Sequence, residues 1–569
     1  MKEKIFISLF LLIISSGFIP NGGRVPVYAK NGIVVSASDI ASDIGRDILK
    51  SGGNAIDAAV ATTFALTVTH PPAGNIGGGG FLVFADKNGT STTIDFREKA
   101  PLAARENMYL DENGNLRGDL SNKIGVLSVG TPGTVAGLFM AHSKYGKLPW
   151  KKLIEPSVKI AKNGIPFTYA LYENSKNRRE VWSKFPSTIR IMMKSDGSVY
   201  EPGEIWKQPD LAMTLKIIAE RGKDGFYKGE VAEKLIAFMT SQGGIMTLKD
   251  LEDYEAVERK PVTGDYRGYS IVTMGPPSSG GITIVEILNI LEGYDLNSMG
   301  YKSADYIHVL KESMKRGFAD RAQYLGDPDF NPDMPLDKLT SKEYASNLRE
   351  GIDMTHSSIS DSLKFGQIYE HGNSTTHLSV IDSEGHAVSL TYTLEQSYGS
   401  QVVAAGLGFF LNNEMGDFNP VPGITNRTGQ IGSKPNLIAP GKRMLSSMTP
   451  TILLKDGKPV IVIGAPGGRT IINTVVQVII NLVDHNMNIA QAVEAPRIHH
   501  QWLPDRIEFE ALSLSADTQK KLKDRGHILY ELPSNSGFGP AMGIKVDLTG
   551  GWLTGAADSR SPDGAAKGY

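Results

Sequence analysis

The sequence predicts an α+β protein, because strand-like runs, helix-like runs and glycine-rich turns alternate along it. Strand-like runs come in pairs around polar turns, which is typical of antiparallel hairpins. At residues 464–468 a glycine turn joins a strand-like run to an apolar helix-like run. The length of 569 residues allows two or three average domains, and it also allows one large continuous core.

The order of the expected elements supports this fold class. Residues 32–38 predict a buried strand, and residues 41–69 predict two helices that Gly52 and Gly53 separate. From about residue 150 to residue 367 the chain is mostly helical and charged. The predicted hairpins are residues 81–85 with 91–97, 376–381 with 386–394, 451–454 with 460–463, and 541–557 around Gly550-Gly551.

Composition excludes several classes of function. The chain has 41% hydrophobic and 21% charged residues, as soluble globular proteins do, and its 62 glycines and 30 prolines indicate many tight loops. A formal net charge of −2, without an extended basic patch, argues against a nucleic-acid partner. Because there is no cysteine, disulfides, thiolate metal sites, thiol catalysis and a lipoprotein anchor are all excluded.

The N-terminus resembles a signal peptide. A short basic start precedes an apolar run at residues 5–14, which is too short to span a bilayer. We expect residues 1–29 to be removed, with a mature start near Lys30; a cut at residues 15–17 is the alternative. Export to the periplasm or secretion would follow, with no stable membrane span afterwards. An uncleaved membrane anchor is the less favoured interpretation.

Thr375 is the candidate nucleophile. An N-terminal threonine can use its own α-amino group, whose pKa of roughly 7.7–8.0 lies near working pH, to accept its hydroxyl proton. This chemistry requires cleavage of the peptide bond between Ser374 and Thr375. Taken alone, a Thr-Thr pair at the start of a strand is more often explained by β-propensity.

Other motifs accompany Thr375 in a fixed order along the chain. They lie at residues 52–59, 69–71, 74–81, 95–98, 130–137, 276–281, 375–377, 391–393, 411–413, 445–448, 466–468 and 562–564. They include Gly-Gly-Asn-Ala-Ile-Asp-Ala-Ala, Gly-Thr-Pro-Gly-Thr-Val-Ala-Gly, Thr-Thr-His and Pro-Gly-Gly. Through this combination the sequence resembles the γ-glutamyltranspeptidase (glutathione hydrolase) family, bacterial type, over nearly the whole mature chain.

The resemblance implies a fold and a maturation step. The fold would be a four-layer αββα sandwich of the N-terminal nucleophile hydrolase type. Self-cleavage between Ser374 and Thr375 would produce a large subunit, residues 30–374, and a small catalytic subunit, residues 375–569. The two chains would form one intertwined heterodimer.

The resemblance also implies the reaction. Thr375 would attack the γ-carbonyl of glutathione or another γ-glutamyl compound and form an ester, which water, an amino acid or a dipeptide would then resolve. Thr393 would hydrogen-bond the nucleophile, and the backbone N–H groups of Gly467 and Gly468 would stabilise the oxyanion. No cofactor and no metal are expected.

The donor's charged groups would be held by two residue sets. The resemblance assigns its α-carboxylate to Arg97, Ser446 and Ser447. It assigns its α-ammonium to Glu395, Glu414 and Asp417. Three clustered acids repel one another in an empty site, so we expect a raised pKa in at least one of them.

Other features have structural interpretations or stay open. Residues 422–433 match a lid loop in which Thr428 replaces the aromatic residue of some relatives, which would favour hydrolysis. The glycine-rich run at residues 74–80 lacks a phosphate-loop ending and predicts tight backbone packing. We assign no metal to His377 or to the pair His499-His500.

Three alternative functions are compatible with the sequence. A cephalosporin or glutaryl acylase would use the same nucleophile, and so would an enzyme acting on poly-γ-glutamate. The pattern of Arg97 with Ser446 and Ser447 favours a donor with a free α-carboxylate. A secreted binding protein that keeps the fold but never matures is the non-catalytic alternative.

Overall fold

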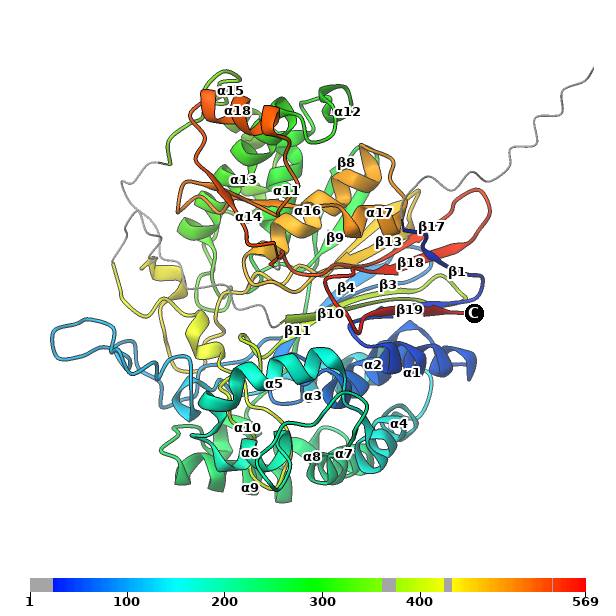
Figure 1. Ribbon diagram of the computed structural model, residues 1–569, viewed down its shortest axis with the longest axis vertical. Helices are drawn as coiled ribbons and strands as arrows, with labels where there is room; N and C mark the ends of the chain where they lie inside the picture. Colours follow the sequence, from blue (N-terminus) through cyan, green and yellow to red (C-terminus); the bar gives the residue numbers. More distant parts are fainter. Residues whose placement is uncertain (1–23, 361–374, 424–431, 535) are drawn as a thin grey trace, which may run out of the picture.

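The computed structural model describes residues 24–360, 375–423, 432–534 and 536–569. Two sheets, each built from strands that are far apart in the sequence, stack face to face between two groups of helices (Figure 1). The sequence predicted the α+β class, and the family resemblance implied the four-layer αββα order; both are confirmed.

The first sheet has seven strands in the described part of the chain. Their order is β1 (Val27–Ala29), β18 (Leu553–Ala557), β17 (Met542–Val546), β13 (Lys458–Gly464), β12 (Thr451–Lys455), β9 (Tyr269–Thr273) and β8 (Val262–Tyr266). All neighbours pair antiparallel. Because β1 pairs with β18, a leader cut after Ala29 would remove an edge strand, whereas a cut at residues 15–17 would keep it.

The second sheet also has seven described strands and carries Thr375. Their order is β19 (Ala565–Gly568), β2 (Ile33–Ser36), β10 (Thr375–Ile381), β11 (Ala387–Thr393), β3 (Gly79–Ala85), β4 (Ser91–Phe96) and β7 (Val257–Arg259). The predicted hairpins are present as β3–β4, β10–β11, β12–β13 and β17–β18.

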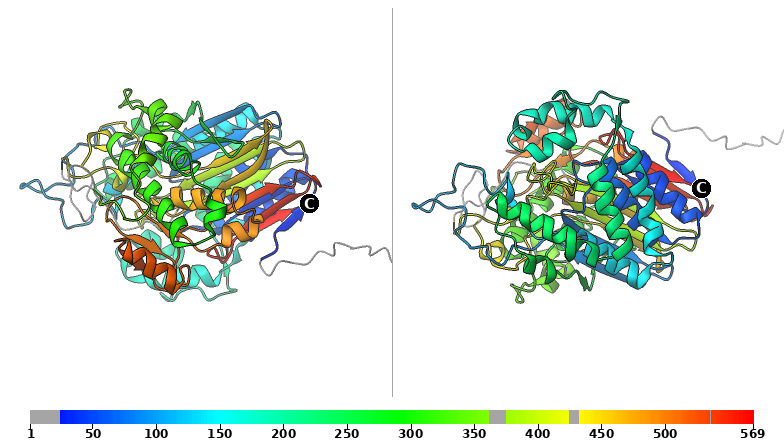
Figure 2. Two further views of the ribbon diagram at one scale, coloured as in Figure 1. Left: turned by 90° about the horizontal axis from the view of Figure 1, so that it is seen from above. Right: turned by 90° about the horizontal axis from the view of Figure 1, so that it is seen from below.

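Helices cover the outer face of each sheet (Figure 2). Below the second sheet lie α1 (Asp39–Lys50), α2 (Ala55–Thr69), α3 (Thr134–Tyr145) and α4 (Trp150–Asn163). Every residue of α2 is buried, because this helix packs between the sheet and α4. Above the first sheet lie α11 (Gly280–Leu291), α13 (Ala304–Tyr324), α16 (Thr470–Val483) and α17 (Ile489–Glu494).

The remaining elements lie around this sandwich. The helices are α5 (Tyr169–Trp182), α6 (Pro186–Met192), α7 (Pro209–Arg221), α8 (Asp224–Tyr227), α9 (Gly229–Ser241), α10 (Leu248–Glu252), α12 (Leu296–Met299), α14 (Leu336–Leu339), α15 (Lys342–Glu350) and α18 (Ala516–Asp524). Two small sheets are formed by β5 (Ile165–Pro166) with β6 (Ile205–Trp206), and by β14 (Ile498–His499), β15 (Ile507–Phe509) and β16 (Leu529–Glu531).

The glycine-rich run before and within β3 is closely packed, as the sequence predicted. A Cβ on Gly78 would lie 2.0 Å from the carbonyl oxygen of Thr393, and one on Gly77 would lie 2.2 Å from that of Phe410. The side chain of Asn75 fixes the same turn, since its Nδ2 donates to the Thr393 carbonyl at 2.9 Å and its Oδ1 accepts from the Gly78 N–H at 2.8 Å. Glycine is therefore required here for close backbone approach.

Candidate active site

Thr375 is the first residue of β10, and strand register brings it to Thr393. The two residues are direct partners in the antiparallel pairing of β10 with β11, so their side chains lie on one face. The Thr375 hydroxyl donates to the Thr393 hydroxyl oxygen at 3.3 Å, and that oxygen also accepts the Glu395 N–H at 2.8 Å. Thr375 is 6% exposed, so its hydroxyl is held in a largely desolvated position.

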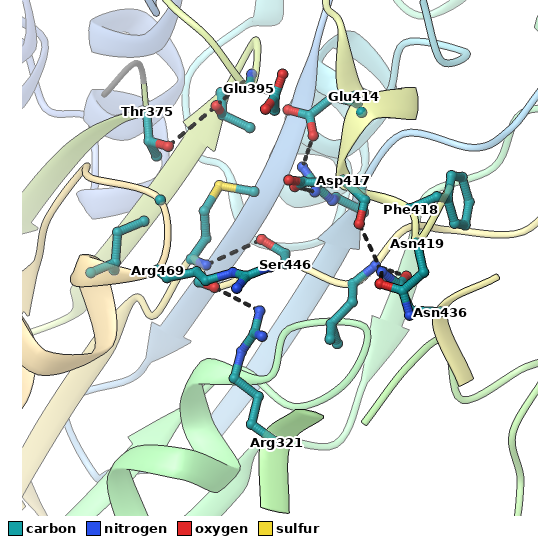
Figure 3. A pocket seen from close by; sticks show the side chains of 18 of the residues that line it. Arg321, Thr375, Glu395, Glu414, Asp417, Phe418, Asn419, Asn436, Ser446 and Arg469 are labelled. Carbon is teal, nitrogen blue, oxygen red and sulfur yellow. Dashed lines mark hydrogen bonds and ion pairs between the residues drawn. The ribbon is translucent and has the colours of Figure 1, made fainter. Parts of the chain in front are cut away.

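One pocket gathers most of the predicted site (Figure 3). Its lining includes Arg97, Thr375, Thr393, Glu395, Glu414, Asp417, Ser446, Ser447 and Gly468. Gly467 lines a second cavity, and Thr375 lines both. Ser374 lies outside the described residues, as does the part of the predicted lid that contains Thr428.

The turn between β13 and α16 presents two glycine amides near this junction. Gly467 and Gly468 have φ values of 130° and 56°, which side-chain-bearing residues rarely adopt. Their carbonyls accept the first bonds of the helix, from Thr470 and Ile471. Within the described part of the chain neither glycine N–H donates a hydrogen bond, so both remain for an anion at the N-terminal end of α16.

Arg97 follows β4 and is completely buried beside three carboxylates. Its guanidinium lies 2.6 Å from a Glu414 oxygen and 3.4 Å from a Glu98 oxygen. It also pairs with Asp417. The predicted carboxylate-binding and ammonium-binding groups therefore bind one another in the ligand-free pocket (Figure 3).

Burial dominates the electrostatics of this cluster. Burial alone would lower the pKa of Arg97, but Glu414, Asp417 and Glu98 raise it above its ordinary value. Burial raises the pKa of Glu98 to about 7, against the effect of Arg97. Burial also raises the pKa values of Glu395 and Glu414 well above the usual range, and neighbouring carboxylates add to both shifts. The expected raised pKa among the three predicted acids thus occurs at two of them.

The serine pair lines the same pocket as Arg97, whose Nε donates to the carbonyl of nearby Met444 at 3.3 Å. The Ser446 hydroxyl oxygen accepts the Met448 N–H at 3.1 Å, and the Ser447 hydroxyl oxygen accepts from Arg321 at 2.9 Å. Backbone contacts fix the segment, because the Ser446 N–H donates to the Pro277 carbonyl at 2.9 Å. The motif at residues 276–281 is thereby joined to the serine pair.

Sequence reasoning missed several residues in or next to the pocket. Glu98 stood inside a recognised motif but received no role, although it shares the buried cluster with Arg97. Arg469 directly follows the predicted glycine turn, and that adjacency could have indicated it. Asn419 lies two residues after the predicted Asp417, so adjacency could have indicated it as well. Arg321 and Asn436 carried no signal of their own, because only packing of distant segments brings them to the pocket.

The histidines considered for metal binding have other partners. His377 is buried in β10 with its ring nitrogens 2.8 Å from the Thr391 hydroxyl and 3.0 Å from the Ser379 hydroxyl. Burial lowers the pKa of His377 to about 3, so its ring is neutral near pH 7. Over the described ranges, no group of three or more potential ligands is arranged to hold a metal ion.

Comparison with known proteins places the chain in a family. The family model described as gamma-glutamyltranspeptidase matches residues 41–568. The chain belongs to this family. The glutathione hydrolase proenzyme of Escherichia coli (strain K12) is 46% identical over 547 residues, covering 96% of this chain and 93% of that protein. The glutathione hydrolase proenzyme of Bacillus subtilis (strain 168) is 39% identical over 557 residues, with 95% and 92% covered.

Solved structures agree with the γ-glutamyltranspeptidase assignment. A cephalosporin acylase from Bacillus halodurans superimposes with a TM-score of 0.83 at 27% identity, covering 98% of this chain and 99% of that chain. The γ-glutamyltranspeptidase of Helicobacter pylori matches with a TM-score of 0.56 at 43% identity, covering 59% and 94%. The expected N-terminal nucleophile hydrolase fold is confirmed, as is the expected enzyme family, that of γ-glutamyltransferases and glutathione hydrolases.

Proposed function

We propose that the chain cleaves itself between Ser374 and Thr375 and then acts as a γ-glutamyltransferase and glutathione hydrolase. The observation that carries this proposal is the contact of Thr375 with Thr393 at the edge of a pocket lined by both acids and arginines. In maturation, the Thr375 hydroxyl attacks the Ser374 carbonyl and displaces the amide nitrogen. Water then hydrolyses the resulting ester, which leaves a carboxylate on Ser374 and a free α-amine on Thr375.

The same hydroxyl performs the enzymatic reaction. The free α-amine of Thr375 accepts the hydroxyl proton while the oxygen attacks the γ-carbonyl of the donor. The N–H groups of Gly467 and Gly468, which have no acceptor in the described part of the chain, stabilise the tetrahedral oxyanion. Collapse expels the donor's amine with a proton and leaves a γ-glutamyl ester, and water, an amino acid or a dipeptide then attacks this ester.

The charged pocket suits the zwitterionic end of a γ-glutamyl donor. The α-ammonium is held by Glu395, Glu414 and Asp417. The α-carboxylate is held by Arg97, Ser446 and Ser447. Donor binding replaces the contacts of Arg97 with Glu414 and Asp417 by contacts with the donor, so charge stays paired before and after binding. An acyl donor without an α-ammonium could not replace Arg97 as the cation beside these acids, which favours this proposal over a cephalosporin or glutaryl acylase.

Cleavage leaves two chains that stay together. Strands from both sides of the cut alternate in the second sheet, where β10 and β11 lie between β2 and β3. The large chain, residues 30–374, and the small chain, residues 375–569, therefore share their sheets and form a heterodimer. We also propose export of the precursor through residues 1–29; none of the described helices is long and apolar enough to cross a membrane.

Intact-mass spectrometry with N-terminal sequencing tests this proposal, with Thr375→Ala and Thr375→Ser as the variants. The wild type should give a fragment that begins Thr375-Thr376-His377 and should cleave the γ-glutamyl amide bond of glutathione. Thr375→Ala should stay uncleaved and inactive, whereas Thr375→Ser keeps a hydroxyl and should still be cleaved. An uncleaved wild-type chain without γ-glutamyl activity would instead support the binding-protein alternative.

A further inference from the structure

Arg321 lies below Ser446 in the view of Figure 3 and links Ser447 of the pocket to Ser279. Its Nε donates to the Ser279 hydroxyl at 2.8 Å, and its Nη2 donates to the Ser447 hydroxyl at 2.9 Å. We propose that Arg321 is a positioning residue that directs the hydroxyl proton of Ser447 towards the donor's α-carboxylate. This inference rests on the proposed function, because it takes the serine pair as the carboxylate site.

The hydrogen bonds at Ser447 determine where its hydroxyl proton can point. A guanidinium can only donate, whereas a hydroxyl has one proton and two acceptor lone pairs. Arg321 therefore occupies a lone pair of the Ser447 oxygen and leaves the proton available. The Met448 N–H does the same at Ser446. Within the described residues neither hydroxyl donates to a protein acceptor, so the pocket presents two O–H donors side by side.

The charge of Arg321 reinforces this arrangement. Its side chain is buried and forms no ion pair with a carboxylate in the described ranges. Burial lowers the pKa of Arg321 to about 9, and the nearby charge of Arg469 contributes to this lowering. Because this pKa is still above 7, Arg321 is a cation at neutral pH. Arg97, in contrast, is surrounded by three acids. The positive charge of Arg321, which no carboxylate pairs with in the described ranges, therefore lies beside Ser447, where it attracts an anion.

Arg321 also holds the backbone of the serine pair through Ser279. The Ser279 hydroxyl accepts from Arg321 and donates to the Ser446 carbonyl at 2.6 Å, while the Ser279 N–H donates to the same carbonyl at 2.8 Å. Arg321 and Ser279 lie before the proposed cleavage position, and Ser446 and Ser447 lie after it. One buried cation thus aligns the donor-binding serines of the small chain from the large chain.

Steady-state kinetics of the cleaved enzyme tests the inference with a double-mutant cycle. The variants are Arg321→Met, Arg321→Lys, Ser447→Ala and the double variant Arg321→Met/Ser447→Ala, with Arg316→Met as a control on the same helix outside the pocket.

Because a hydrogen bond from a charged group is lost, Arg321→Met should raise KM for a γ-glutamyl anilide about tenfold or more. It should change kcat by less than about threefold, since donor binding is altered more than chemistry. Arg321→Lys, which can still donate, should restore most of the affinity, and Arg316→Met should leave KM unchanged.

In the Ser447→Ala background, Arg321→Met should have less than about a twofold further effect, because the group it positions is absent. Effects that multiply independently would overturn the inference. So would a reduced melting temperature or slowed cleavage in Arg321→Met without any change in KM, because a merely structural role predicts that result.

Competition by two small molecules provides a second readout. Arg321→Met should weaken inhibition by L-glutamate about tenfold but leave inhibition by 4-aminobutyrate, which lacks the α-carboxylate, unchanged. Equal weakening of both inhibitors would overturn the inference. Normal wild-type turnover combined with an unchanged KM in Arg321→Met counts against the inference alone, whereas a wild type without γ-glutamyl turnover counts against the proposed function.

Discussion

The hydroxyl of Thr375 donates to the hydroxyl of Thr393 across two paired strands, 3.3 Å apart. The Thr393 oxygen also accepts the Glu395 N–H at 2.8 Å, so this oxygen is fixed before a donor arrives. The backbone of Thr393 is fixed as well, because its carbonyl accepts a hydrogen bond from Asn75. The nucleophile is therefore aligned by a rigid strand partner.

Removal of the Thr393 hydroxyl should slow both reactions of Thr375. We expect Thr393→Val to lower kcat and the rate of self-cleavage about 10- to 100-fold, because one hydrogen bond that orients the nucleophile is lost. Thr393→Ser keeps the hydroxyl and should stay within about threefold of the wild type. Progress curves and time-resolved gels would measure both rates. Full activity in Thr393→Val would show that this contact does not orient the nucleophile.

Donor affinity should depend on pH through the buried acids. Their pKa values are raised, to about 7 for Glu98 and well above the usual range for Glu395 and Glu414, so a larger neutral fraction persists at mildly acidic pH. A neutral acid attracts the donor's ammonium less than a carboxylate does. KM should therefore fall as pH rises from 6 to 8, and Glu414→Gln should flatten this profile. A flat wild-type profile would contradict the prediction.

Loss of the Arg97 charge should destabilise the protein as well as weaken donor binding. Arg97→Met leaves the buried Glu98 and Glu414 and the partly exposed Asp417 without their cation, and breaking a buried network typically costs about 3–5 kcal/mol. The control Arg190→Met removes an exposed pair with Asp210 and should cost no more than about 1 kcal/mol. Denaturant unfolding at pH 7 would compare the two. Equal stability of both variants would exclude a structural role for the Arg97 cluster.

A methyl group on Gly78 should disturb the active site through the backbone of Thr393. The added Cβ would lie 2.0 Å from the Thr393 carbonyl oxygen, so Gly78→Ala must displace the strand that holds the nucleophile's partner. We expect a loss of about 1–3 kcal/mol of stability and slower self-cleavage. A Cβ on Gly118 would meet nothing within 4 Å, so Gly118→Ala should have almost no effect on either measurement. Similar behaviour of the two variants would rule out the packing explanation.

Local pattern was sufficient for the elements that carry the site. The pairing of β10 with β11 followed from β-rich runs around a Gly-containing turn, and the glycine turn before α16 followed from its sequence. The two helices at residues 41–69 were separated where Gly52 and Gly53 predicted. These features depend on backbone preferences and side-chain periodicity, which neighbouring residues determine.

Motif resemblance added the family and nine of the residues that line the pocket, but it could not show how those residues contact one another. That Arg97 pairs with Glu414 and Asp417 in the empty pocket depends on loops more than 300 positions away in the chain. The placement of Gly467 and Gly468 on two different cavities is likewise a property of the folded turn.

By itself the sequence determined the fold class, the nucleophile candidate and the family, because each is encoded in local patterns or in the order of motifs. Only the tertiary structure decided that Arg321 reaches Ser447 and that Thr375 lies between two cavities. A charged residue on a helix has no sequence signal for burial. Its environment, and hence its chemistry, is set by segments that come together only when the two sheets and their helices pack.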